Sequence, residues 1–175
     1  MIQPFTLSVF TENRIGLLNR ISGILTRRHI NIESFTASET EIKDVFRFTI
    51  VVNTTREQVD KLRTQFEKLV EVLKAFVHEE SEVVRQELAL YKVSTKFLDA
   101  GSIENLIREQ HARILTITPE YLVLEKTGHF EETQEMLQKL ERFGVMEFTR
   151  SGTVAIIKWS RRFHMHLKDL EAIPA

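Results

Sequence analysis

Apolar side chains recur at every second position of residues 46–52, and this alternation limits the fold of the chain more than any other feature. Phe46, Phe48, Ile50 and Val52 would lie together on one face of a β-strand, because successive side chains of a strand point to opposite faces. Residues 5–9 repeat the pattern. The chain therefore has to build a sheet with an apolar face that other elements cover.

Two segments of the first half have the spacing of helices that can cover such a face. The first helix is predicted to end near Arg28 and His29, and the second to start at Thr54 or Thr55, since each threonine precedes a capping-box partner. Further strands are predicted at residues 31–37 and 70–77, which gives the order βαββαβ. The apolar residues of the two helical stripes are Leu17, Leu18, Ile21, Ile24 and Leu25, and then Val59, Leu62, Phe66 and Leu69.

The second half repeats this order. A helix is predicted to begin at a capping Ser102 and another to span residues 130–143. The fold class is therefore α+β, with two ferredoxin-like βαββαβ domains. We expect a first domain at residues 1–78, a linker at 79–86, a second domain at 87–159 and a tail at 160–175. The strands predicted for this half are residues 88–93, 114–118, 121–125, 145–148 and 154–157.

Composition excludes several classes of function. Residues 1–80 carry 11 basic and 11 acidic side chains, and the remaining residues carry 13 and 14, so neither half has the positive excess of a nucleic-acid-binding protein. The absence of cysteine excludes disulfides, thiolate metal sites and thiol nucleophiles. No apolar stretch is long enough to span a membrane, so a cytoplasmic protein without membrane contact is expected.

The turn between the first strand and the first helix is the clearest candidate site. Gly16, placed in the first turn of that helix, would leave backbone N–H groups uncovered, and these groups with the helix dipole favour an anion such as a free amino acid's carboxylate. The alternative is an ordinary turn with Asn13 near the N-cap. Asn31, after the helix, is either a turn residue or a ligand contact.

No catalytic or metal-binding cluster is evident. The histidines are scattered, and His164 and His166 have no cysteine or acidic cluster beside them that would favour a metal. Phe46 and Phe48 are open to a second interpretation as a base-stacking platform, since RNA-recognition domains share the βαββαβ order. Arg47 is the only basic residue between them, so burial in a core is favoured over RNA binding.

A domain of this size buries little apolar surface, and helices cover only one face of its sheet. Pairing with a second copy would cover more of the surface. We therefore expect a homodimer formed through the first domain.

Several segments resemble one family. Asn13 and Gly16, with the later Asn-Ile-Glu-Ser at residues 31–34, are similar to the ACT domain of the small regulatory subunit of acetolactate synthase, also called acetohydroxyacid synthase. The resemblance covers residues 4–158, and continues through residues 68–73, 85–90, 117–119 and 150–152. Arg14 departs from the family pattern, residues 94–112 match it poorly, and the tail beyond Trp159 has no clear counterpart.

The resemblance implies a first domain of the ACT type that binds a branched-chain amino acid, usually valine, between two copies. Gly16 would permit close approach, the N–H groups at the helix start would hold the carboxylate, and Asn13 would accept from the ammonium group. Asn31 and Ile32 of the partner copy would complete the site. The full set of effector-binding residues is Asn13, Arg14, Ile15, Gly16, Leu17, Leu18, Asn31 and Ile32, with no catalytic residue and no metal ligand.

The resemblance also implies partners. A small subunit of this family is not itself an enzyme: it activates the catalytic large subunit and makes it sensitive to feedback inhibition. Thiamine diphosphate, Mg²⁺ and FAD would belong to that large subunit, and this chain is expected to hold no cofactor. The alternative is a stand-alone ACT amino-acid sensor that controls another partner.

Overall fold

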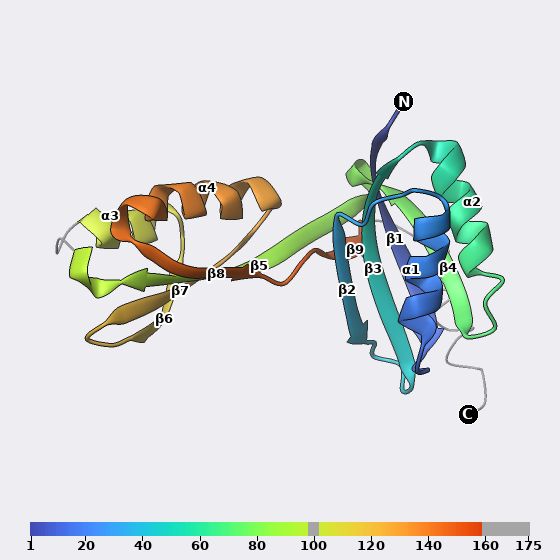
Figure 1. Ribbon diagram of the computed structural model, residues 1–175, viewed down its shortest axis with the longest axis horizontal. Coiled ribbons are helices and arrows are strands. Elements are labelled where there is room, and N and C mark those ends of the chain that lie inside the picture. The colour runs from blue at the N-terminus through green and yellow to red at the C-terminus, as the bar shows by residue number, and fades with distance from the viewer. Residues whose placement is uncertain (98–101, 159–175) are drawn as a thin grey trace. The chain divides into compact units, whose positions relative to one another are not determined.

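The computed structural model describes residues 1–97 and 102–158, which form two compact units (Figure 1). The first unit comprises residues 1–84 together with the described residues from Thr153 onward, and the second comprises residues 85–152. Each unit has its own hydrophobic core.

The first unit is a four-stranded antiparallel sheet with the strand order β2-β3-β1-β4. Both of its helices lie on the same face of the sheet (Figure 1). This arrangement is the predicted ferredoxin-like fold. In chain order the elements are β1 (Gln3–Glu12), α1 (Leu17–Arg27), β2 (Ser34–Glu39), β3 (Val45–Thr54), α2 (Arg56–Phe66) and β4 (Val72–Glu79).

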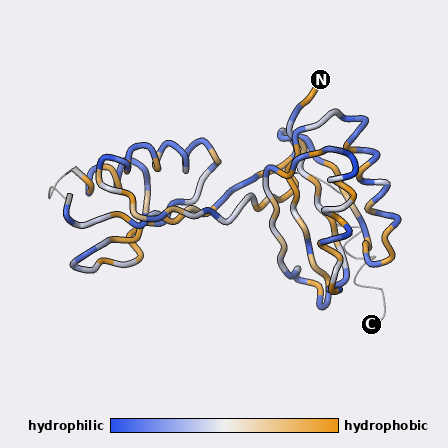
Figure 2. The backbone as a smooth tube through the Cα atoms, in the orientation of Figure 1, coloured by the Kyte–Doolittle hydropathy of each residue, from blue (hydrophilic) through white to orange (hydrophobic). Residues whose placement is uncertain are grey.

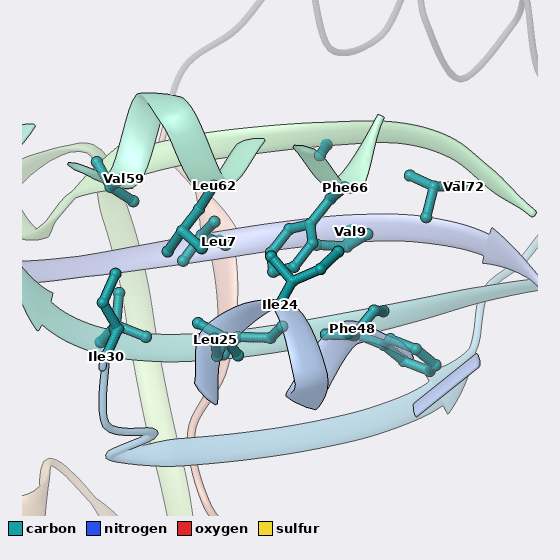
Figure 3. Close-up of a cluster of buried hydrophobic side chains, with 14 of the residues drawn as sticks. Leu7, Val9, Ile24, Leu25, Ile30, Phe48, Val59, Leu62, Phe66 and Val72 are labelled. Carbon is teal, nitrogen blue, oxygen red and sulfur yellow. The ribbon is translucent and has the colours of Figure 1, made fainter. Parts of the chain in front are cut away.

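Alternation in the strands and helical spacing in α1 and α2 together produce the first core. Leu7 and Ile50 face each other across β1 and β3 and are fully buried, with Leu62 of α2 above them. Figure 3 shows these helices and strands contributing side chains to one cluster, and Figure 2 shows apolar residues concentrated along the strands. Each fully buried Leu or Ile stabilises the fold by about 1.5–3 kcal/mol relative to an exposed position.

The aromatic pair of β3 belongs to this core. Phe48 is 8% exposed and packs against Phe35, with ring centroids 5.4 Å apart, and Phe46 packs against the same cluster. Because Phe48 is buried and Phe46 is partly buried against the same core, the two rings do not form an exposed platform for a nucleic-acid base. The core-packing interpretation of these two residues is therefore correct.

Two element boundaries of the first unit differ from the predictions. β2 begins at Ser34 rather than at Asn31, so Asn31 and Ile32 lie in the connection that precedes it. α2 begins after Thr55, whose hydroxyl accepts a hydrogen bond from the Gln58 N–H at 3.3 Å. Thr55 is thus the cap, and the Thr54 hydroxyl donates to the Gln58 side chain instead.

The second unit has the strand order β6-β7-β5-β8, which reproduces the order of the first. Its core is built from alternate residues of β5, such as Ala89, Tyr91 and Val93, beneath Met136 and Leu140 of the last helix. The helix predicted near Ser102 is present, with Ser102 as its first residue rather than the residue before it. Its elements are β5 (Val83–Ser94), α3 (Ser102–Glu109), β6 (Arg113–Ile117), β7 (Tyr121–Gly128), α4 (Phe130–Leu140) and β8 (Val145–Arg150).

The junction between the units differs from the expected linker and strand pairing. Residues 79–86 contain the end of β4, a 3₁₀ turn (Glu80–Glu82) and the start of β5, rather than an irregular linker. The last strand, β9 (Val154–Ile157), pairs with β5, as β8 does, and residues 153–158 group with the first unit. The predicted second domain had included these residues. The tail from residue 160 lies outside the described residues.

The sheet of the first unit has a buried histidine on the face opposite α1 and α2. His78 lies opposite Thr6 on β1 and is 7% exposed, and its ring stacks on Phe76 with centroids 6.2 Å apart. Burial lowers the pKa of His78 because the imidazolium loses its hydration, and Arg47 lowers it further against an opposing effect of Glu82.

This histidine should make stability depend on pH. Because its pKa is lowered in the folded state, His78 takes up a proton less readily there than in the unfolded chain, which binds one below about pH 6.5, so its contribution to folding is lost as the pH falls below that value. We expect His78→Gln to lose less of its free energy of unfolding than wild type between about pH 8 and about pH 5.5. Urea denaturation at both pH values measures this difference, and equal losses would contradict it.

Candidate functional site

Gly16 stands between β1 and α1 as the N-cap of the helix, one position before its first turn. Its backbone has φ of 85° and ψ of −7°, in the left-handed region that glycine enters at little cost. The prediction placed Gly16 inside the helix, and the structure corrects this. A Cβ at this position would meet nothing within 4 Å, so the backbone conformation and not lack of space accounts for the glycine.

The start of α1 has no side-chain cap and no acidic residue in its first turn. The Leu17 N–H donates to the Arg14 carbonyl at 3.3 Å, and the Gly16 carbonyl accepts from the Arg20 N–H at 3.2 Å. The N–H groups of Leu18 and Asn19 follow in the first turn, where a helix has no backbone acceptors of its own. These two donors at the positive end of the helix dipole are suited to a small anion.

The charged side chains beside this turn are paired with each other. Arg14 contacts Glu12 at 3.0 Å, and Arg20 makes a two-pronged contact with Glu71, the shortest N–O distance being 2.7 Å. A backbone hydrogen bond and Arg20 hold the pKa of Glu71 below its usual value. Each guanidinium group has a carboxylate partner that offsets its charge, so the backbone amides at the start of α1 are the donors best placed for an incoming anion.

The side chains of the predicted site divide into exposed and buried sets. Asn13, Arg14, Ile15 and Gly16 are exposed, and Ile15 is completely so. Leu18 is 51% exposed, whereas Leu17 is 2% exposed and packs in the core. Leu17 therefore belongs to the turn through its backbone only, and Ile15 and Leu18 are the apolar side chains that an aliphatic ligand can contact.

Asn31 and Ile32 lie beyond the opposite end of α1 from Gly16. The helix has 11 residues, which corresponds to about 16 Å at 1.5 Å per residue. Asn31 is exposed, and Ile32 is partly buried against the core. One chain thus does not bring the two segments together, and a small amino acid that touched both would need one segment from each of two chains.

The described histidines have roles in local structure. His29 and His111 occupy turns with positive φ after α1 and α3, and His129 is the N-cap of α4, in a capping box with Glu132. His164 and His166 lie outside the described residues. Within residues 1–97 and 102–158, no three acidic or histidine side chains are grouped in a way that would hold a metal ion. In the same ranges, no helix is both long and apolar enough to cross a membrane.

Sequence reasoning missed the acidic partners of this site. Glu12 is close to the turn in the chain, but Glu71 is 51 residues from Arg20, and no local pattern connects them. The only available signal was the resemblance of residues 68–73 to the family, which suggested no role for Glu71.

The fold and the turn together define a two-domain protein of the ACT class, with the candidate ligand site in the first domain. Residues 7–74 match the AHAS small subunit-like ACT domain, and residues 86–159 match the small subunit of acetolactate synthase. The chain belongs to the family of acetolactate synthase small subunits.

Relatives extend the match along most of the chain. The acetolactate synthase small subunit of Bacillus subtilis is 34% identical over 163 residues, 93% of this chain and 94% of the relative. That of Mycobacterium bovis is 36% identical over 159 residues, 89% of this chain and 93% of the relative. The crystal structure of the small subunit from Thermotoga maritima superposes with a TM-score of 0.84 at 27% identity and covers 91% of this chain and 99% of that one.

Proposed function

We propose that this chain is the regulatory subunit of an acetolactate synthase. In this role it binds the catalytic large subunit, raises its activity and makes it sensitive to a branched-chain amino acid, with valine as the first candidate. Family membership supports the partnership. The observation that carries the effector proposal is the uncapped, left-handed Gly16 turn, with donors for a carboxylate beside two exposed aliphatic side chains.

The proposed effector site lies between two copies of the chain. The carboxylate is bound by the N–H groups of Leu18 and Asn19, and the Asn13 side-chain oxygen accepts from the ammonium group. Asn31 and Ile32 of a second copy complete the site. The separation of these two segments by the length of α1 supports a homodimer through the first unit, because one chain contributes only half of the contacts.

Regulation then follows because binding of the amino acid is linked to the arrangement of the subunits in the complex. The amino acid shifts the activity of the complex only if it binds one arrangement of the subunits more tightly than another. Thiamine diphosphate, Mg²⁺ and FAD supply the chemistry on the large subunit in this proposal, and this chain contributes binding and coupling.

Two measurements test the proposal. Calorimetric titration of valine, leucine and isoleucine into the purified chain should show binding of at least one of them. Addition of the chain to its catalytic subunit should raise acetolactate production, and the bound amino acid should lower it. Binding of the amino acid without any association with the catalytic subunit would favour the stand-alone sensor, and binding of neither would overturn the proposal.

A further inference from the structure

Two hydroxyl groups of β2 hold the backbone of Thr153. The Thr153 N–H donates to the Ser34 Oγ at 2.7 Å, and the Thr36 Oγ1 donates to the Thr153 carbonyl at 3.0 Å. Ser34 and Thr36 lie on the same face of the strand because they are two residues apart. Both polar backbone groups of a single residue are therefore bound by side chains of one strand, and we call these three residues the hydroxyl clamp.

Thr153 marks the point where the chain re-enters the first unit. Gly152, with a positive φ of 79°, is the last residue of the second unit, and β9 follows Thr153 directly. The Lys158 N–H then donates to the Glu82 carbonyl at 2.9 Å, beside the start of β5. The chain enters the second unit through β5 and returns through Thr153, so the clamp fixes the returning end.

The strand that carries the clamp begins two residues after the proposed effector contacts. Asn31 and Ile32 precede β2, and the Glu33 N–H is fixed to the Val51 carbonyl at 2.9 Å. Residues 31–32 are joined to Ser34 through Glu33 alone, so a displacement of them that broke the Glu33–Val51 hydrogen bond would pull on Ser34 and Thr36 at the start of the strand paired with β3. Both clamp hydrogen bonds would then be made or lost together.

We propose that the hydroxyl clamp couples the effector site to the second unit. Occupancy at Asn31 and Ile32 changes the position of β2, and Ser34 and Thr36 pass this change to Thr153 and so to the returning end of the second unit. This inference rests on the proposed function for its ligand. Ser34 and Thr36 act as positioning residues, because the coupling passes through Thr153 and neither residue is among the proposed effector contacts.

The test compares three variants of the full chain. Ser34→Ala/Thr36→Val removes both hydroxyls. Ser34→Thr/Thr36→Ser keeps both. Ser38→Ala removes an exposed hydroxyl from the same strand and the same face. We expect the first variant to bind valine in calorimetry within about threefold of wild type, while its complex with the catalytic subunit needs on the order of tenfold more valine for half-inhibition. The other two variants should behave as wild type.

Hydrogen exchange measured without ligand tests the anchoring of Thr153 by the clamp independently of the proposed effector binding. Amides of residues 154–158 should exchange on the order of tenfold faster in the first variant than in wild type or Ser38→Ala, because loss of the clamp frees the returning strand. Unchanged exchange, or unchanged inhibition with wild-type affinity, would overturn the coupling role. If wild type binds none of the three amino acids, the proposed function fails and the coupling fails with it, while the exchange rates still decide whether the hydroxyls anchor Thr153.

Discussion

Gly16→Asp should abolish inhibition of the reconstituted synthase by its branched-chain amino acid while leaving activation of the catalytic subunit intact. The new carboxylate would stand at the uncapped start of α1, where it can accept the free amide hydrogens and repel the carboxylate of the effector. Cβ at this position points into open space, so the core is not disturbed. Acetolactate production measured with and without saturating valine gives the result.

Gly16→Asn is the matched control for this variant. Asparagine and aspartate have nearly the same shape, and both enter the left-handed region more readily than other side chains, so each tolerates φ of 85° to a similar degree. They differ in charge, and only aspartate opposes the carboxylate of the effector electrostatically. Gly16→Asn should therefore keep more valine sensitivity than Gly16→Asp. Wild-type sensitivity in Gly16→Asp would reject the site.

Local periodicity was enough to predict the helices and strands and their order along the chain. The alternation of Phe48, Ile50 and Val52 predicted a strand with one buried face, and the structure buries all three beneath the helices. The position of Gly16 could not be predicted as well. The apolar stripe of α1 starts at Leu17 and fits a helix that begins before or at that residue, because spacing alone does not distinguish the cap from the first turn.

Contacts between residues far apart in the chain could not be predicted from local sequence patterns. The Arg20–Glu71 pair joins residues 51 apart, and the Thr36–Thr153 hydrogen bond joins residues 117 apart. Each depends on how strands are ordered in the sheet, and periodicity within a segment carries no information about that order. The Gly16 turn predicted an anion such as a free amino acid's carboxylate, but the proposed catalytic partner and the branched-chain class of effector came from the resemblance to a family.

The start of β5 shows a further reason why prediction failed. Val83, Glu87 and Ala89 are buried on one face of the strand, but Val83 and Val84 are the only apolar residues of the predicted linker at 79–86, so that segment showed no apolar period. Glu87 then breaks the apolar pattern between Val83 and Ala89. Glu87 is only 4% exposed. A buried carboxylate needs partners, and its partners come from α4 and β8, more than 40 residues later.

These partners form a compact polar cluster in the second unit. The Thr133 hydroxyl donates to the Glu87 carboxylate, and the Tyr91 hydroxyl donates to the Thr133 carbonyl at 2.7 Å. The Arg150 Nε lies 3.4 Å from Glu87 in an ion pair without a hydrogen bond. The Arg150 guanidinium also stacks between two aromatic rings, 4.4 Å from the Phe130 centroid and 4.9 Å from the Phe148 centroid.

Arg150→Ala should destabilise the second unit by about 3–5 kcal/mol, because it leaves the Glu87 charge buried without a cation and removes the packing between the rings. Both tyrosines of the chain, Tyr91 and Tyr121, lie in this unit, so fluorine NMR of fluorotyrosine-labelled protein during urea denaturation reports on it separately.

Two further variants distinguish the charge of Arg150 from its packing. Arg150→Met keeps a long side chain between Phe130 and Phe148 but still leaves Glu87 unpaired, so it should lose nearly as much stability as Arg150→Ala. Glu87→Gln/Arg150→Met removes both charges and should recover most of the loss, since replacing a buried ion pair by neutral groups of similar volume is often close to neutral. If Arg150→Met instead matched wild type, packing against the rings and not neutralisation of Glu87 would be the contribution of Arg150 to the second core.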